Sequence, residues 1–399
     1  METLPRILII PSWYPPDGGY FFKEHSEAIA GIGWQADVLV NRLVGVRRLL
    51  RDGRSALHGY REREENGLRV IRAVTLKLPG NEKRNIRRWA GRTLRIYERD
   101  VYRTGKPGLI LAHSVTWAGY AASLIGERYR IPYVIVEHRS FFVWSTEQAR
   151  GMVKPFHLPF FEKAYRDCAR LVLVSPSLLT GLKTLMPWIE EKTTVIPNMI
   201  REEMFLPPSA PRKSDPFVFI WAGRLEHVKG LDLLLEAVRI LKERSRREFS
   251  VRLAGRGSLR RELEQFAAEL GVGDRVQFLG RISREQMQEE LQGANCFVLP
   301  SRYEAFGAVL IEAMAAGLPL IATRSGGPDH IVTPRSGLLV ETEQAGQLAD
   351  AMEQVMENEA DYDPAEIRTS AMERYGAPVV LEQYDRLFRG VLQAATPGK

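Results

Sequence analysis

The sequence predicts an α/β protein with two doubly wound parallel-sheet domains, and three observations support this class. At 399 residues the chain is too long for one compact core, since domains average roughly 150 residues. Short runs of Val, Ile and Leu alternate with helical patterns through both halves, which is typical of strands buried on both faces. Four prolines in ten residues mark a linker at 207–216.

The first half repeats a unit of apolar strand, loop and helix. The uncharged stretch 108–126 is long enough for a membrane span, but its interior histidine, serine and threonine residues favour a strand that ends at His113 and a following helix. The predicted strands are 6–12, 36–42, 68–74, 109–114, 133–138, 170–176 and 193–197. They indicate a first domain over 1–206.

The alternation restarts after the linker and predicts a second domain over 217–377. A final helix within 378–399 is expected to return to the first domain. The predicted strands are 217–223, 250–255, 275–280, 296–301, 318–323 and 337–341, with helices at 231–246, 258–270 and 284–294. Two such domains would face each other across a cleft at the carboxyl ends of their strands, where α/β proteins bind ligands.

Cysteine usage and the amino terminus indicate a cytoplasmic protein. Cys168 and Cys296 have neither CxxC nor metal-ligand spacing, so two buried thiols in a reducing compartment are expected. The apolar run 7–10 is too short for the core of a signal peptide.

Positive charge is concentrated in one region, 41–106. It holds 19 Lys and Arg against 7 Asp and Glu, whereas the rest of the chain has 37 against 42. Spacings of three and four recur from Lys83 to Arg103, so much of this charge would share one helix face. Such a face is either simply solvated or contacts an anionic partner, for which a membrane surface, a phosphorylated acceptor and nucleic acid are the candidates.

The stretch 300–328, PSRYEAFGAVLIEAMAAGLPLIATRSGGP, contains a strand end, a loop and a helix start. Its helix begins near Ala308 after Gly307, and free backbone N–H groups at such a start suit a phosphate or a sugar hydroxyl. Glu304 and Glu312 are eight residues apart, or about 12 Å along a helix. A glycosidase pair needs roughly 5 to 9.5 Å, so these two carboxylates are expected to bind separate hydroxyls of one ligand.

A second motif, WAGRLEHVKG at 221–230, places two cations where a strand ends and a helix begins. The guanidinium of Arg224 and the ammonium of Lys229 fit a diphosphate leaving group.

With these motifs the chain resembles the retaining glycosyltransferases of family 4, the group 1 set, which have the GT-B fold. The resemblance rests on EAFGAVLIE at 304–312, followed by AMAAGLPLIAT and SGGP, and on GRLEHVKG, LAGRGSLRREL, FLGRI and IPN. PSWYPPDGGYFFKEHSEAI is similar to the opening glycine loop of the family.

The resemblance implies a role for each matched residue of the second domain. Arg224 and Lys229 would hold the donor diphosphate, Glu312 the ribose hydroxyls and Glu304 the sugar hydroxyls. The backbone amides that would complete this pocket belong to Phe306, Gly307 and Ala308. The positions that would hold the nucleobase are Gly255, Arg256 and Arg281.

In the first domain the resemblance implies that Gly18 and Gly19 approach the diphosphate. His138 would contact the donor sugar near the reacting carbon. His113 ends another strand at the same edge and is the alternative. Arg139 follows His138 where the family often has glycine, which affects the expected acceptor side.

The expected activity is a retaining, metal-independent transfer of a hexose or N-acetylhexosamine from a UDP- or GDP-sugar to a hydroxyl acceptor. The acceptor would serve cell-envelope glycan or glycolipid synthesis and can be lipid-linked or anionic, and the basic 41–106 region can contact the inner face of the membrane. No cofactor and no nucleic-acid partner are expected. No metal is expected either, because the DxD at 361–363 lies in an acidic surface run. Two alternatives are another GT-B enzyme (a phosphorylase or a nucleotide-sugar epimerase) and a non-catalytic protein that binds polyanions or sugar nucleotides.

Overall fold

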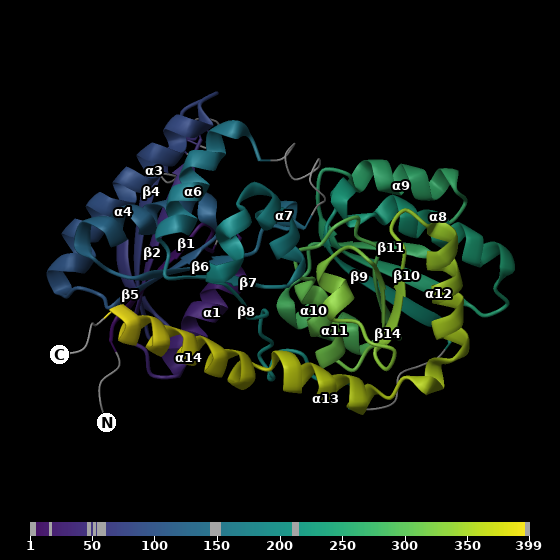
Figure 1. Cartoon of the computed structure of the whole chain (residues 1–399). Coiled ribbons are helices and arrows are strands. Elements are labelled where there is room, and N and C mark those ends of the chain that lie inside the picture. The colour runs from purple at the N-terminus through teal and green to yellow at the C-terminus, as the bar shows by residue number, and fades with distance from the viewer. Residues whose placement is uncertain are drawn as a thin grey trace. The chain divides into compact units, whose positions relative to one another are not determined.

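The computed structural model describes residues 5–15, 18–45, 49–50, 53, 61–143, 153–209 and 215–395. Its contacts divide the chain into two compact units (Figure 1). The N-terminal unit holds residues 1–174, 179–196 and 381–399, and the C-terminal unit holds 175–178 and 197–380. The division thus lies near Ile196, ahead of the proline-rich segment 207–216, of which 210–214 are outside the described residues.

The N-terminal unit is built on an eight-stranded sheet with the order β3-β4-β2-β1-β5-β6-β7-β8. Every neighbouring pair is parallel except β3 and β4. The strands are β1 (Ile7–Pro11), β2 (Ala36–Val44), β3 (Arg61–Glu65), β4 (Leu68–Leu76), β5 (Leu109–His113), β6 (Tyr133–Glu137), β7 (Arg170–Leu173) and β8 (Thr193–Val195). Seven of these follow the predicted apolar runs.

Strand β3 was not predicted, because its sequence REREE has no apolar residue. It is an edge strand that pairs antiparallel with β4. Asn66 and Gly67, both with positive φ (50° and 75°), make the tight turn between the two strands. This turn geometry favours Asn-Gly and sets the register of the hairpin.

Helices cover both faces of the N-terminal sheet. The helices are α1 (Tyr20–Gly31), α3 (Glu82–Ile96), α4 (Tyr120–Tyr129), α6 (Leu158–Asp167), α7 (Ser177–Leu185) and α14 (Ala377–Ala395). Figure 1 shows α3, α4 and α6 on one face, with α1 and the last part of α14 on the other. Residues from 381 onward pack on this unit, where the Trp34 indole donates to Asp385 at 2.9 Å. None of the described helices combines the length and the apolar content needed to cross a membrane.

The C-terminal unit has a six-stranded, fully parallel sheet with the order β11-β10-β9-β12-β13-β14. Its strands are β9 (Phe217–Arg224), β10 (Phe249–Arg256), β11 (Val276–Gly280), β12 (Cys296–Leu299), β13 (Leu320–Thr323) and β14 (Gly337–Val340). Its helices are α8 (Leu231–Arg244), α9 (Arg260–Glu269), α10 (Arg284–Gln292), α11 (Ala308–Ala315), α12 (Ala345–Glu357) and α13 (Pro364–Tyr375). The predicted α/β class is confirmed.

In both sheets the strand order reverses at one point, between β1 and β5 and between β9 and β12. Ligands of open α/β sheets bind at the carboxyl ends of the strands beside such a reversal. The sequence places His113 at the end of β5 and Arg224 at the end of β9. The topology therefore predicts ligand binding at the carboxyl edges of the two sheets.

Candidate functional site

The predicted cations of the C-terminal unit lie where β9 ends. A short 3-10 turn, His227–Lys229, carries Lys229 and is followed by Gly230 with φ 65°. A Cβ at Gly230 would lie 2.0 Å from the carbonyl oxygen of Pro300, which follows β12. Glycine at this position thus lets the Lys229 turn press against the end of the neighbouring strand.

Lys229 and Glu304 form an ion pair. Both side chains are largely buried, at 19% and 15% exposure. The Glu304 amide donates to Ser325 at 2.8 Å, and the Gly327 amide donates to the Glu304 carbonyl at 2.8 Å. The two residues expected to bind diphosphate and sugar are therefore in direct contact and held by the backbone.

The residues Phe306 and Gly307 lead into α11 as expected. Gly307 has φ 91° and is the N-cap of the helix. Phe306 packs edge-on against Tyr375, and its Cα would lie 2.3 Å from a Cβ at Gly327. The first amides of α11 have no acceptor within the helix. The sequences AFG and SGG thus allow a close backbone crossing beside a helix start that can bind an anion.

Arg302 was not singled out from the sequence, yet it braces this edge. Its guanidinium donates to both carboxylate oxygens of Asp232, at 2.8 and 2.7 Å, and to the His227 carbonyl at 2.7 Å. It also pairs with Glu343 at 2.6 Å. Burial raises the pKa of Asp232, but the hydrogen bonds and charge of Arg302 outweigh burial and lower the pKa below its usual value.

A pocket of about 310 Å³ opens beside the ends of β9 and β10. Paired positions explain its shape: Gly223 lies opposite Gly255, and a Cβ at Gly255 would lie 1.8 Å from the Gly223 carbonyl oxygen. The predicted residues that line it are Arg224, Gly255, Arg256, Arg281 and Glu312. The structure thus brings together the residues expected to hold the base, the ribose and part of the diphosphate.

The pocket also has walls that sequence reasoning missed. Phe205 comes from the segment before the linker, and it is 4% exposed. Ser283 and Met287 come from the start of α10, where Ser283 caps the helix by accepting from Gln286. Phe205 carries no signal in the sequence, whereas the capping pattern at Ser283 could have placed the start of α10 at this edge.

The N-terminal unit brings the two candidate histidines together. His113 Nδ1 lies 3.2 Å from His138 Nε2. His113 is fully buried against Phe22, with ring centroids 4.7 Å apart, whereas His138 is only half-buried. His138 is therefore the more exposed residue of the pair, and the fully buried His113 hydrogen-bonds to it.

Glu137 fixes the His138 loop and was not predicted. It is fully buried, and its Oε1 accepts from the amides of His138 and Arg139, both at 3.0 Å. Its Oε2 accepts from the Val115 amide at 3.1 Å and from the Tyr165 hydroxyl at 2.9 Å. A buried carboxylate with four donors ties the ends of β5 and β6 to each other.

Three histidines of this unit have lowered pKa values. Burial lowers the pKa of His25 to about 3. Burial, with smaller contributions from His25 and His138, holds the pKa of His113 well below its usual value. Burial and His25 likewise lower the pKa of His138. The group is therefore neutral at physiological pH.

Gly18 and Gly19 precede α1 with φ of 113° and 73°. A Cβ at Gly19 would lie 2.5 Å from the Trp13 carbonyl oxygen, so glycine permits a close turn there. Trp13 also lies 4.8 Å below the guanidinium of Arg139, whose pKa burial lowers. The two predicted glycines thus share one edge with the residue that departs from the family pattern.

Two family models match consecutive parts of the chain. "Glycosyltransferase Family 4" matches residues 27–203, and "Glycosyl transferases group 1" matches residues 204–374. The chain belongs to the group 1 glycosyltransferases of family 4.

This group 1 chain has relatives of widely spread origin. An uncharacterized glycosyltransferase of Methanocaldococcus jannaschii is 31% identical over 51% of this chain and 54% of that protein. TuaC of Bacillus subtilis, named for teichuronic acid biosynthesis, is 27% identical over 87% of this chain and 88% of that protein. The chain spans 54% and 66% of the length of two uncharacterized M. jannaschii relatives it matches.

Solved structures show that the group 1 chain has the GT-B fold. Sucrose-phosphate synthase of Thermosynechococcus elongatus superimposes with a TM-score of 0.77 over 98% of this chain and all of that chain, at 22% identity. Anabaena HepE, solved with UDP-glucose, superimposes with a TM-score of 0.71 over 96% of this chain and 99% of that one, at 18% identity.

Proposed function

We propose that this protein transfers a hexose or N-acetylhexosamine from a nucleoside diphosphate sugar to a hydroxyl acceptor, with retention and without a metal. The contact between Lys229 and Glu304 carries the proposal, because it joins a phosphate-binding cation to a hydroxyl-binding carboxylate. The adjoining pocket, with Arg224, Arg256, Arg281 and Glu312, has the size and polarity to take a nucleotide. The structures of HepE were solved with UDP and UDP-glucose, which favours a UDP-sugar donor here.

In the proposed reaction the acceptor oxygen forms a bond to the anomeric carbon while the bond from that carbon to the diphosphate breaks. The acceptor proton passes to an oxygen of the departing diphosphate. Arg224, Lys229 and the amides of Phe306, Gly307 and Ala308 would stabilise the charge that develops on the diphosphate. Because these cations come from the protein, the step needs no divalent ion.

The N-terminal unit would supply His138 beside the reacting carbon, with His113 and Glu137 holding it in place. Gly18 and Gly19 would approach the diphosphate with their backbone. A cell-envelope acceptor that is lipid-linked or anionic, and a peripheral position at the inner face of the membrane, complete the proposal. The basic helix α3 and the relative named for teichuronic acid biosynthesis support them.

Thermal stabilisation of the purified protein by UDP-, GDP- and ADP-sugars, each beside its free nucleotide, tests the donor assignment. A ligand that binds only the folded state stabilises it by RT ln(1 + [L]/Kd), where [L] is the free ligand concentration. We expect one nucleotide diphosphate to raise Tm and its sugar to change that shift, with the same result in EDTA. Arg281→Gln and Glu312→Gln should remove the shift, while Arg335→Gln, on the surface of the same unit, should keep it.

The rival functions predict other results. Dependence of turnover on inorganic phosphate would indicate a phosphorylase, and turnover without an acceptor would indicate an epimerase. If no nucleotide shifts Tm while a polyanion does, the transferase proposal is overturned in favour of a binding protein.

A further inference from the structure

Helix α3 has one apolar face and one arginine face. Ile86, Trp89, Ala90, Thr93 and Ile96 are buried against the sheet. Arg88, Arg92 and Arg95 are exposed, and their spacing of four and three places them on one side of the helix. Of the basic 41–106 region, Arg47, Arg48, Arg51 and Arg54 lie outside the described residues.

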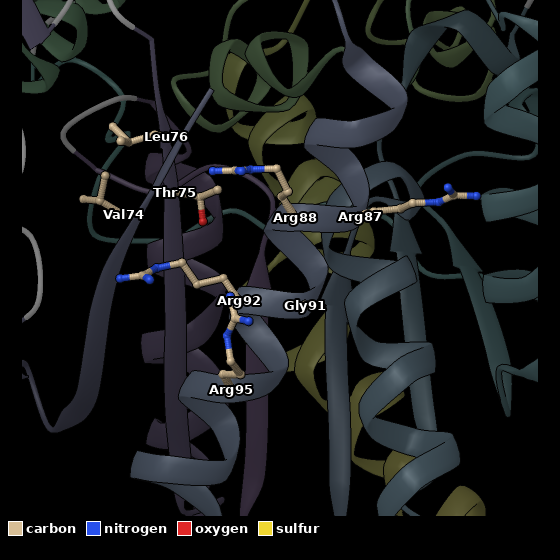
Figure 2. A pocket seen from close by; sticks show the side chains of 8 residues that line it. All are labelled: Val74, Thr75, Leu76, Arg87, Arg88, Gly91, Arg92 and Arg95. Atoms are coloured by element: carbon tan, nitrogen blue, oxygen red, sulfur yellow. The ribbon is translucent and has the colours of Figure 1, made fainter. Parts of the chain in front are cut away.

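These three arginines open onto a cavity of about 600 Å³ between α3 and the end of β4. Figure 2 shows Arg88 and Arg92 extending in the same direction, with Arg95 beside Arg92, and Thr75 and Leu76 of β4 across from them. Arg87 also borders the cavity but extends to the other side of the helix, toward the Phe160 ring at 5.8 Å. The described residues that line the cavity include no carboxylate.

Arg88, Arg92 and Arg95 differ from their neighbours in having no acidic partner among the described residues. Arg69, Arg72 and Arg99 in the same region pair with Glu62, Glu65 and Asp100. Within the described part of the chain no ion pair joins Arg88, Arg92 or Arg95 to a carboxylate. Like charges on successive turns repel and destabilise a helix, so a bound anion would stabilise this arrangement.

Gly91 is the residue without a side chain in the helical wall of the cavity. It lies in the interior of α3, where glycine destabilises a helix relative to alanine. Packing does not require it, since a Cβ at this position would meet no atom within 4 Å. The missing side chain therefore leaves room between Arg88 and Arg95 that a larger residue would fill.

The cavity lies at the carboxyl edge of the N-terminal sheet, the edge that also carries the histidines. Val38 of β2 lies opposite both Ile9 of β1 and Val70 of β4, and Ile9 lies opposite Leu111 of β5. Val74 to Leu76 are thus beyond the level at which β5 ends. Strand β4 is three strands from β5 and four from β6, or about 14 to 19 Å across the sheet.

We propose that Arg88, Arg92 and Arg95 form a binding site for a phosphate or diphosphate ester. Guanidinium groups match phosphate oxygens with paired charge-assisted hydrogen bonds, and three of them around one cavity suit a group with two or more negative charges. The phosphate belongs either to the acceptor itself, which would hold its hydroxyl toward His138, or to the headgroup of an anionic lipid. The acceptor as source rests on the proposed function; the phosphate chemistry of the site does not.

Deuterium exchange of the full-length protein with inorganic pyrophosphate tests the site, read at α3. We expect pyrophosphate to protect residues 82–96. The triple variant Arg88→Gln, Arg92→Gln, Arg95→Gln should raise the half-saturating concentration about tenfold or more. The matched triple Arg103→Gln, Arg128→Gln, Arg170→Gln removes as many exposed charges from the same unit outside the cavity and should stay within about twofold of wild type. Gly91→Leu, which fills the cavity without changing charge, should also weaken protection.

Two further comparisons, with soluble phosphates and with lipid vesicles, identify the source of the phosphate. Protection by pyrophosphate or glycerol phosphate in solution would assign the site to a phosphate of the acceptor. Protection only by vesicles of phosphatidylcholine with phosphatidylglycerol, and not by phosphatidylcholine alone, would assign it to a lipid headgroup. The site is overturned if neither protects α3, if the matched triple loses as much affinity as the arginine triple, or if Gly91→Leu binds like wild type.

The same experiment separates this site from the donor site, since residues 224–230 are followed in parallel. Protection of 224–230 by pyrophosphate, with no protection of 82–96 by pyrophosphate, glycerol phosphate or vesicles, would overturn the arginine site alone. Protection of 82–96 without 224–230 would count against the proposed donor site and leave the arginine site standing.

Discussion

Arg302 and Asp232 form a two-point salt bridge, with nitrogen–oxygen distances of 2.8 and 2.7 Å, that joins the loop after β12 to the first turn of α8. The same guanidinium donates to the carbonyl of His227, which begins the turn that carries Lys229. It thus fixes the Lys229 turn relative to the loop that carries Glu304. Neither side chain lines the nucleotide pocket, so their contribution is to position residues that do bind.

Removing this salt bridge should lower both the free energy of unfolding and the accuracy with which Lys229 and Glu304 are positioned. For Asp232→Asn we expect a loss of about 1–2 kcal/mol in the free energy of unfolding, since the carboxylate is part-exposed and water compensates some of the change. Urea denaturation measures this, and steady-state kinetics should show a lower kcat. Arg335→Met removes an exposed pair with Glu366 and should change neither by a measurable amount. Equal losses in the two variants would contradict the bracing role.

Lys229→Ala should lower the rate of transfer by about 10²- to 10³-fold, because one charged donor to the departing diphosphate is lost. The folded state should remain, as circular dichroism and Tm can show. Lys242→Ala, which removes an exposed pair with Asp274, is the control. A near-normal rate in Lys229→Ala would remove the residue from the diphosphate site.

Because three histidines of the N-terminal unit are neutral in the folded protein, we expect the protein to lose stability in mild acid. His25, His113 and His138 have pKa values below the ordinary value of about 6.5 in the folded state, so the unfolded chain binds more protons between that value and the folded pKa. Their contribution is complete above about pH 6.5 and is lost as pH falls toward 3. Each histidine can add up to about 1.4 kcal/mol per pH unit to the slope.

Urea unfolding at several pH values between about 7.5 and 5 measures that slope. His25→Phe, which keeps an aromatic ring against Tyr384, should make the slope shallower. His227→Phe, in the other unit, should leave it unchanged. A slope that His25→Phe does not alter would show that burial of His25 is not linked to folding.

The two candidate histidines of the site, His113 and His138, should differ in kinetics. His138→Ala should lower kcat strongly, since His138 is the residue proposed to lie beside the reacting carbon and the more exposed of the two. His113→Leu removes the 3.2 Å hydrogen bond to His138 and should lower kcat about tenfold with little change in KM. His113→Asn, which can still hydrogen-bond from a similar position, should recover part of the loss. If Leu and Asn behave alike, His113 acts through packing rather than through the hydrogen bond.

Most of the fold could be predicted from local pattern. The buried strands have continuous apolar sequences, and thirteen of the fourteen strands in the described residues overlap the predicted ranges. The one that was missed, β3, has five polar residues and exists because β4 offers an unpaired edge. An edge strand of this kind is specified by its partner and its turn rather than by its own hydrophobicity.

The sequence by itself determined the two α/β units and the motifs expected to bind the donor. These motifs could be predicted because strand ends, glycine turns and helix starts depend on residues that are adjacent in the sequence. They contain Arg224, Lys229, Glu304 and Gly307. Only the tertiary structure decided that Glu137 anchors His138, that Arg302 braces Asp232, that Phe205 closes the nucleotide pocket and that three arginines of α3 enclose a cavity beside β4. These arrangements bring together residues far apart in the sequence, such as Phe205 and Met287, which line one pocket although 82 positions separate them. Hydrophobic periodicity in the sequence does not predict such pairs. They depend on which strands become neighbours in the sheet and on which side chains then come into contact when the helices pack.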